Sequence, residues 1–101
     1  MPLCLVLHDL PAGGTEVLEA AIWELSESHW TPMANALLVS SDLSVDYISS
    51  HLTRALRREN IGGTVLVMRA ESRVVAEGVS PEAVAWLHEQ GRLEPAGAAI
   101  N

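Results

Sequence analysis

Lysine is absent from this 101-residue chain, and cysteine occurs only once. The cations are six arginines against thirteen acidic residues, so the formal charge is −7. Polyanion binding depends on clustered cations that release counterions, and this balance therefore disfavours nucleic acid as a partner over most of the surface. With Cys4 as the single cysteine, no intramolecular disulfide can form, which indicates a cytoplasmic location. Cys4 lies in an apolar run, so we expect it to be a small buried apolar side chain.

The chain also has no long apolar run. Its first such stretch, residues 3–7, is far shorter than the roughly 20 residues that span a bilayer, and no positively charged segment precedes it. We expect neither a signal peptide nor a membrane contact. Since 49% of the residues are apolar, the composition predicts one globular domain over residues 1–92, followed by a flexible tail over residues 93–101.

The opening stretch predicts the central strand of a sheet, at residues 3–9. A short apolar run that ends at the turn formers of residues 11–14 is typical of a strand buried on both faces. Asp9 stands at the C-terminal tip of this strand. We expect its carboxylate to cap the amides of the following turn, and metal binding is the alternative.

A helix and a hairpin follow. The spacing of Leu18, Ala21, Ile22 and Leu25 predicts a helix from an N-cap at Thr15 to about residue 28. Trp23 falls on the opposite side of that helix, where it packs on a loop or contacts another chain. Residues 29–31 and 36–40 are predicted strands of a hairpin, and Pro32 assigns the first of them to the sheet edge.

The second helix has the clearest pattern. Ser44 is its predicted N-cap, and apolar residues recur at helical spacing up to Arg58. The last turns carry Arg54, Arg57 and Arg58, half of all the cations. The helix dipole favours positive charge there. We therefore interpret the cluster as a solvated face of the helix, and an anion-binding site is the alternative.

Residues 64–69 are a β-branched run that predicts a second central strand, next to the first. Residues 73–76 predict a short edge strand, and Ser80-Pro81-Glu82 predicts the start of a helix that ends at Gly91. The order of elements predicts an α+β, ferredoxin-like βαββαβ antiparallel sheet with helices on one face, plus a short extra strand and a C-terminal helix.

The histidines do not have zinc-site spacing along the chain. His29 is far in sequence from the adjacent residues His8 and Asp9. These three residues can therefore meet only if the topology brings them to one end of the sheet. There they would form a metal or acid–base site. Asp9 and His8 are the candidate catalytic residues, and Asp9 is the candidate metal ligand.

Five short features occur in order over most of residues 3–88: Leu7-His8-Asp9-Leu10, His29-Trp30, Leu37-Leu38-Val39, Ser41-Asp42-Leu43-Ser44 and Ala85-Trp86-Leu87. In this order they resemble the SinR family of small Cas-like proteins. The layout is also similar to the ferredoxin-like CRISPR-associated adaptation nucleases and virulence-associated ribonucleases. The resemblance implies a homodimer, in which Asp9 of each subunit matches the carboxylate that binds a divalent metal in nuclease-active relatives.

Two hypotheses about function follow, and whether the chain is an enzyme stays open between them. The first is a non-enzymatic homodimeric interaction or assembly module of Cas-like type, without a cofactor, with Trp23, Trp30 and Trp86 as candidate interface residues. The second is an endonuclease that cuts RNA or DNA with Mg²⁺ or Mn²⁺ held by Asp9 of both subunits. A small-molecule sensor is a third option, for which the sequence specifies no ligand.

Overall fold

The computed structural model describes residues 2–26, 28–70 and 77–90 of the chain. The chain divides into two units, Met1–Ala70 and Glu71–Asn101. The first unit contains β1 (Leu3–Asp9), α1 (Gly14–Trp23), β2 (Ser28–Met33), β3 (Ala36–Ser40), α2 (Val45–Arg58) and β4 (Thr64–Arg69). The second unit contains α3 (Pro81–Glu89).

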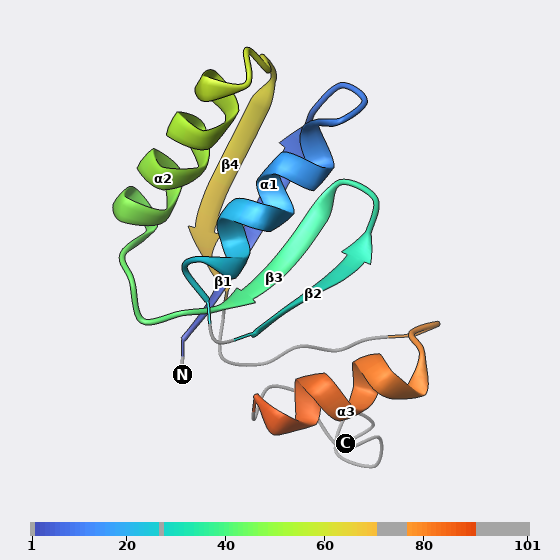
Figure 1. Ribbon diagram of the computed structural model, residues 1–101. Helices are drawn as coiled ribbons and strands as arrows, with labels where there is room; N and C mark the ends of the chain where they lie inside the picture. The colour runs from blue at the N-terminus through green and yellow to red at the C-terminus, as the bar shows by residue number, and fades with distance from the viewer. Residues whose placement is uncertain (1, 27, 71–76, 91–101) are drawn as a thin grey trace. The chain divides into compact units, whose positions relative to one another are not determined.

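The first unit is an α+β fold, with α1 and α2 on one face of a four-stranded antiparallel sheet (Figure 1). The strand order is β2-β3-β1-β4, the order of a ferredoxin-like arrangement. This confirms the predicted fold class. β1 pairs with β3 on one side and with β4 on the other, so the predicted central position of the first strand is also confirmed.

The prediction of a central position for β4 is wrong. β4 pairs with β1 as expected, but among the residues that the structure describes no strand pairs with its other side, so β4 is an edge of this sheet. Its side chains alternate between more and less exposed positions, as in a strand with one solvated face. An apolar, β-branched composition alone did not distinguish these two positions.

The core lies between the sheet and the two helices. Cys4 and Val6 of β1 point to this side, where they are fully buried. The helices contribute apolar residues at the spacing that the sequence showed, with Leu18 and Ile22 from α1 and Ile48 and Leu52 from α2, and β3 contributes Leu37 and Val39. Each helix therefore turns its predicted apolar stripe to the sheet.

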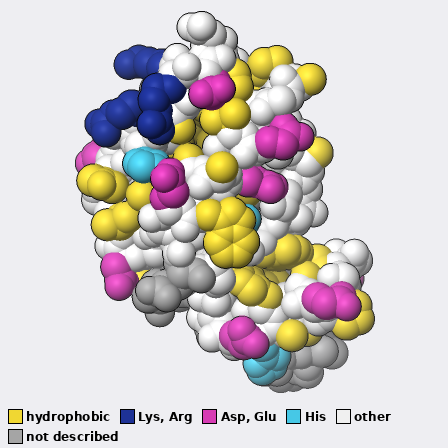
Figure 2. Space-filling model, viewed as in Figure 1, with side chains coloured by type: hydrophobic (Ala, Val, Ile, Leu, Met, Phe, Trp, Pro, Cys, Tyr) yellow, Lys and Arg dark blue, Asp and Glu magenta, His cyan; other side chains and the backbone are white. Residues whose placement is uncertain are grey.

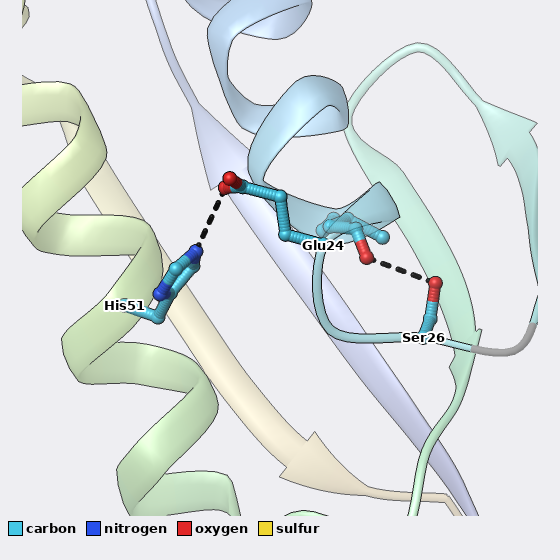
Figure 3. A network of polar contacts seen from close by, with 4 residues as sticks. Glu24, Ser26 and His51 are labelled. Atoms are coloured by element: carbon cyan, nitrogen blue, oxygen red, sulfur yellow. Dashed lines mark hydrogen bonds and ion pairs between the residues drawn. The ribbon is translucent and has the colours of Figure 1, made fainter.

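The bounds of α1 differ from the prediction at both ends. The N-cap is Gly13, with φ of 89°, and no side chain caps the helix, so Thr15 is not the cap. The helix ends at Trp23 and not near residue 28. There the carbonyl of Ile22 accepts hydrogen bonds from the amides of Leu25 and Ser26. It also accepts one from the Ser26 hydroxyl (Figure 3). This local turn ends α1, and β2 begins at Ser28.

The hairpin and the other two helix starts follow the sequence. β2 is an edge strand with a bulge between Trp30 and Met33, at the predicted Pro32 position. The Ser44 hydroxyl accepts from the Tyr47 amide at 3.1 Å, and the Ser80 hydroxyl accepts from the Ala83 amide at 3.2 Å. Both N-caps are confirmed.

One polar contact joins α2 to the end of α1. His51 Nε2 of α2 lies 3.0 Å from Glu24 Oε1, just after α1 (Figure 3). It fixes which flank of α2 faces α1. The predicted strand over residues 73–76, the Gly91 helix end and the tail over residues 93–101 lie outside the described residues.

Gly63 is the position where the fold requires glycine most clearly. Its φ is +145°, and a Cβ there would lie 2.6 Å from the Asp9 carbonyl oxygen, where β4 approaches β1. The adjacent Gly62 has open space where a Cβ would stand, and its φ is not positive. The two glycines thus differ in backbone angle and in their approach to β1.

We expect Gly63→Ala to lower the free energy of unfolding by about 1–3 kcal/mol, because the new methyl group and the backbone strain both act at the β1–β4 junction. Gly62→Ala is the matched control and is expected to change it by less than about 1 kcal/mol. Urea denaturation followed by circular dichroism measures both. Equal effects of the two substitutions would contradict this account.

Candidate functional site

Asp9 lies at the tip of β1 with an exposed carboxylate. Residues Leu7, His8, Asp9, Thr64 and Leu66 line a shallow hollow of about 200 Å³ there. In the part of the chain that the structure describes, the carboxylate makes no hydrogen bond or ion pair. The Gly14 amide donates to the Pro11 carbonyl at 2.9 Å. No amide of this turn donates to the Asp9 carboxylate in the described structure, so the predicted role of Asp9 as a turn cap is wrong.

His8 points to the opposite side of the strand from Asp9, because successive residues of a strand alternate between its faces. The His8 side chain is 6% exposed, and neither of its ring nitrogens has a hydrogen-bond partner in the described structure. Only its backbone is bonded, through its amide to the Asn35 carbonyl at 2.9 Å and through its carbonyl to Asn35 Nδ2 at 3.0 Å. The two candidate catalytic residues thus do not converge on one point.

His29 is not brought to the same end of the sheet. It lies opposite Val39, which in turn lies opposite Cys4, so it is two strands across and about four residues along from His8. Standard strand dimensions make that separation about 16 Å between Cα atoms. The His29 ring instead packs edge-on against Trp23, with centroids 4.6 Å apart. The structure does not assemble a site from His8, Asp9 and His29.

The remaining histidines have other places in the fold. His51 bonds to Glu24 between the helices, and His88 belongs to the last turn of α3, in the other unit. Within the described residues, no group of three or more His, Cys, Asp or Glu side chains is placed to hold a metal ion. The candidate metal ligand Asp9 therefore belongs to no such group among the described residues.

The three tryptophans differ in exposure. Trp23 is 63% exposed on the outer side of α1, as its place on the helical wheel indicated, with one ring edge against His29. Trp30 of β2 and Trp86 of α3 are half-buried, and each has a further interaction within the chain. Trp23 is the one of the three whose ring is mostly open to solvent.

Three of the four arginines of the first unit lie at one end of α2. Arg54, Arg57 and Arg58 are all exposed there, and Figure 2 shows arginine side chains concentrated over that end. None of the three forms an ion pair with another described residue, in contrast to His51, which pairs with Glu24. This agrees with the interpretation of a solvated face at the helix C-terminus.

A contact that sequence reasoning missed joins Arg69 to Cys4. The guanidinium of Arg69 donates to Cys4 Sγ at 3.0 Å, and it also donates to the carbonyls of Ser41 and Leu43. Burial raises the pKa of the Cys4 thiol above its usual 9.0, and the nearby Arg69 charge opposes that rise. Arg69 therefore ties the end of β4 to β1 and to the loop before α2, across 65 residues of sequence.

No helix in the described residues is both long and apolar enough to span a membrane. Comparisons of this chain with protein-family models, with curated proteins and with solved structures found no match.

His8 gives the first test of this site. A buried imidazole with two unsatisfied nitrogens costs stability, so His8→Leu is expected to raise the free energy of unfolding by about 1 kcal/mol, measured by urea denaturation. Val6→Ala, at a neighbouring buried position on the same side, is the control and is expected to lower it. A loss of stability in His8→Leu would contradict this and would indicate a polar partner for the ring.

Cys4 predicts a stability change in alkali. The raised pKa means that the folded thiol stays protonated after the unfolded thiol begins to ionise. The contribution of this thiol to the free energy of unfolding is therefore complete below pH 9.0 and is lost as the pH rises beyond it. We expect the urea midpoint of the wild type to fall more steeply above pH 9.0 than that of Cys4→Ala. Parallel curves for the two proteins would refute the effect.

Proposed function

We propose that this chain is a homodimeric, non-enzymatic interaction or assembly module of Cas-like type. The observation that carries the proposal is the separation of the chemically capable side chains. His8 is enclosed on the helix side of β1, whereas Asp9 is exposed on the other side. A single unassisted carboxylate offers a substrate neither a general acid–base pair nor a complete metal site.

The exposed apolar side chains support association. Trp23, Leu66 and Met68 are 63%, 51% and 39% exposed, and the last two lie on the same face of the edge strand β4. Burying a large apolar side chain contributes roughly 1.5–3 kcal/mol, so a few such residues covered twice in a symmetric dimer contribute substantially. The charge of −7 favours a protein partner over a polyanion.

The direct test is sedimentation velocity of the purified protein at micromolar concentration. We expect a dimer, because association is what would cover these exposed apolar side chains. A single species with the mass of one chain would overturn the proposal. Repeating the run at high salt separates apolar from ionic contributions, since salt screens ion pairs and strengthens apolar burial.

The second candidate is a divalent-metal-dependent endonuclease that uses Asp9 of both subunits. The unengaged carboxylate of Asp9 in its hollow favours it, because nothing in the described structure assigns that side chain a structural role. Mg²⁺ and Mn²⁺ prefer carboxylate oxygens, and an ion between two copies of Asp9 would relieve their repulsion and activate a water. This function requires a dimer in which the two carboxylates meet.

Incubation with single- and double-stranded RNA and DNA, with Mg²⁺ or Mn²⁺, tests this candidate. Under the non-enzymatic proposal we expect no cleavage that depends on Asp9. Asp9→Ala is compared with Asp42→Ala, an exposed carboxylate in the loop before α2. Cleavage that is lost only in Asp9→Ala would establish the endonuclease and overturn the non-enzymatic proposal.

A further inference from the structure

The outer edge of β4 has the features of a strand that can accept a partner. The Ala70 amide donates to the Leu3 carbonyl at 3.0 Å, which fixes the alternation of the antiparallel ladder. The backbone groups of Leu66 and Met68 therefore face β1, and those of Val65 and Val67 face outward. β4 contains no proline or bulge to protect this edge, in contrast to β2 at the other edge of the sheet.

One flank of α2 lies beside the same edge. The opposite flank faces α1, as the His51–Glu24 contact shows. Thr53 and Arg57 line a groove of about 320 Å³ together with Val65 near the start of β4. The other end of the helix adjoins the end of β4, because the Arg69 guanidinium donates to the Leu43 carbonyl just before α2. α2 therefore runs antiparallel to β4 along its outer side.

The residues along this flank form a self-complementary series. Asp46, Ser49, Thr53 and Arg57 follow one another at intervals of three, four and four, so they lie on one side of the helix. An acid stands at one end, hydroxyls lie in the middle, and a cation stands at the other end. Asp46 and Arg57 are about 16 Å apart along the axis, too far to pair within one chain.

We propose that the outer edge of β4 and this flank of α2 are the interface with a second copy of the chain, related by a two-fold axis. The inference rests on the proposed homodimer and specifies its geometry. Antiparallel packing of the two α2 flanks sets Asp46 of each copy against Arg57 of the other, with Ser49 against Thr53. The small hydroxyl side chains in the middle permit close approach of the helices.

The strands fit the same axis. When the two β4 strands pair antiparallel about Val67, the outward backbone groups of the two copies bond to one another and join the sheets into one of eight strands. Leu66 of each copy then lies opposite Met68 of the other on the exposed face. The pairing covers two exposed apolar side chains of the first unit and brings no like charges together.

This geometry has a consequence for Asp9. Asp9 lies opposite Thr64, one strand inward and three residues along from Val67. Standard strand spacings then place the two Asp9 residues of the dimer about 25 Å apart. Two carboxylates at that separation do not share an ion, so the β4-edge dimer and the endonuclease with paired Asp9 exclude one another.

A charge exchange tests the interface. Asp46→Arg and Arg57→Asp each place two like-charge pairs in the dimer, and each is expected to weaken dimerisation at least about tenfold in sedimentation equilibrium. The double variant D46R/R57D restores both pairs in reverse and is expected to return to within about threefold of the wild type. The double variant also loses both charges that interact favourably with the helix dipole, so its helix is expected to be less stable than that of either single variant. A change in helix stability therefore cannot explain recovery of dimerisation in the double variant.

A second pair of variants tests the strand edge. Leu66→Glu is expected to weaken the dimer, whereas Met33→Glu, at an exposed position on the opposite edge strand, is expected to leave it unchanged. A wild-type dimer that withstands D46R, R57D and Leu66→Glu overturns this interface but leaves the homodimer standing. A wild-type monomer overturns both. Weakening without rescue in D46R/R57D overturns the proposed helix pairing.

Discussion

The pairing of β1 on both sides is the constraint on which the rest of the first unit depends. β1 is held in register by β3 and by β4, so its alternate side chains are assigned to opposite faces of the sheet. Cys4 and Val6 consequently face the helices and make the contact with α1 and α2. A shift of one residue would exchange the two faces. The chain therefore needs a precise entry into β4, and Gly63 allows it by passing close to the Asp9 carbonyl.

The parts of this fold that the sequence predicted are those with local causes. Ser44 and Ser80 each accept a bond from an amide three residues later, and such caps are visible as residue types at fixed spacing. The apolar spacing of α2 and the run that forms β1 are equally local. The fold class then follows from the order of these elements, since few topologies accommodate them.

The parts that the sequence did not predict depend on residues far apart in the chain. The edge position of β4 is a property of the assembled sheet, and its β-branched composition is compatible with either position. The Arg69–Cys4 contact spans 65 residues, and no spacing rule connects them. At Asp9, both a turn cap and a metal ligand were compatible with the local sequence, and only the turn cap is decided, because the Gly14 amide donates to the Pro11 carbonyl and not to Asp9.

The alternation of β1 also determines what Asp9 can do. His8 and Asp9 are consecutive, so the strand directs the buried His8 side chain and the exposed Asp9 side chain to opposite faces of the sheet. Under the endonuclease hypothesis, a second copy of Asp9 would have to complete the site at this tip. A dimer formed through the sheet face that carries Asp9 would supply it, whereas a dimer through the β4 edge would not. In the proposed homodimer, the position of the two-fold axis would therefore decide whether the two Asp9 carboxylates meet, and the self-complementary flank of α2 favours the edge.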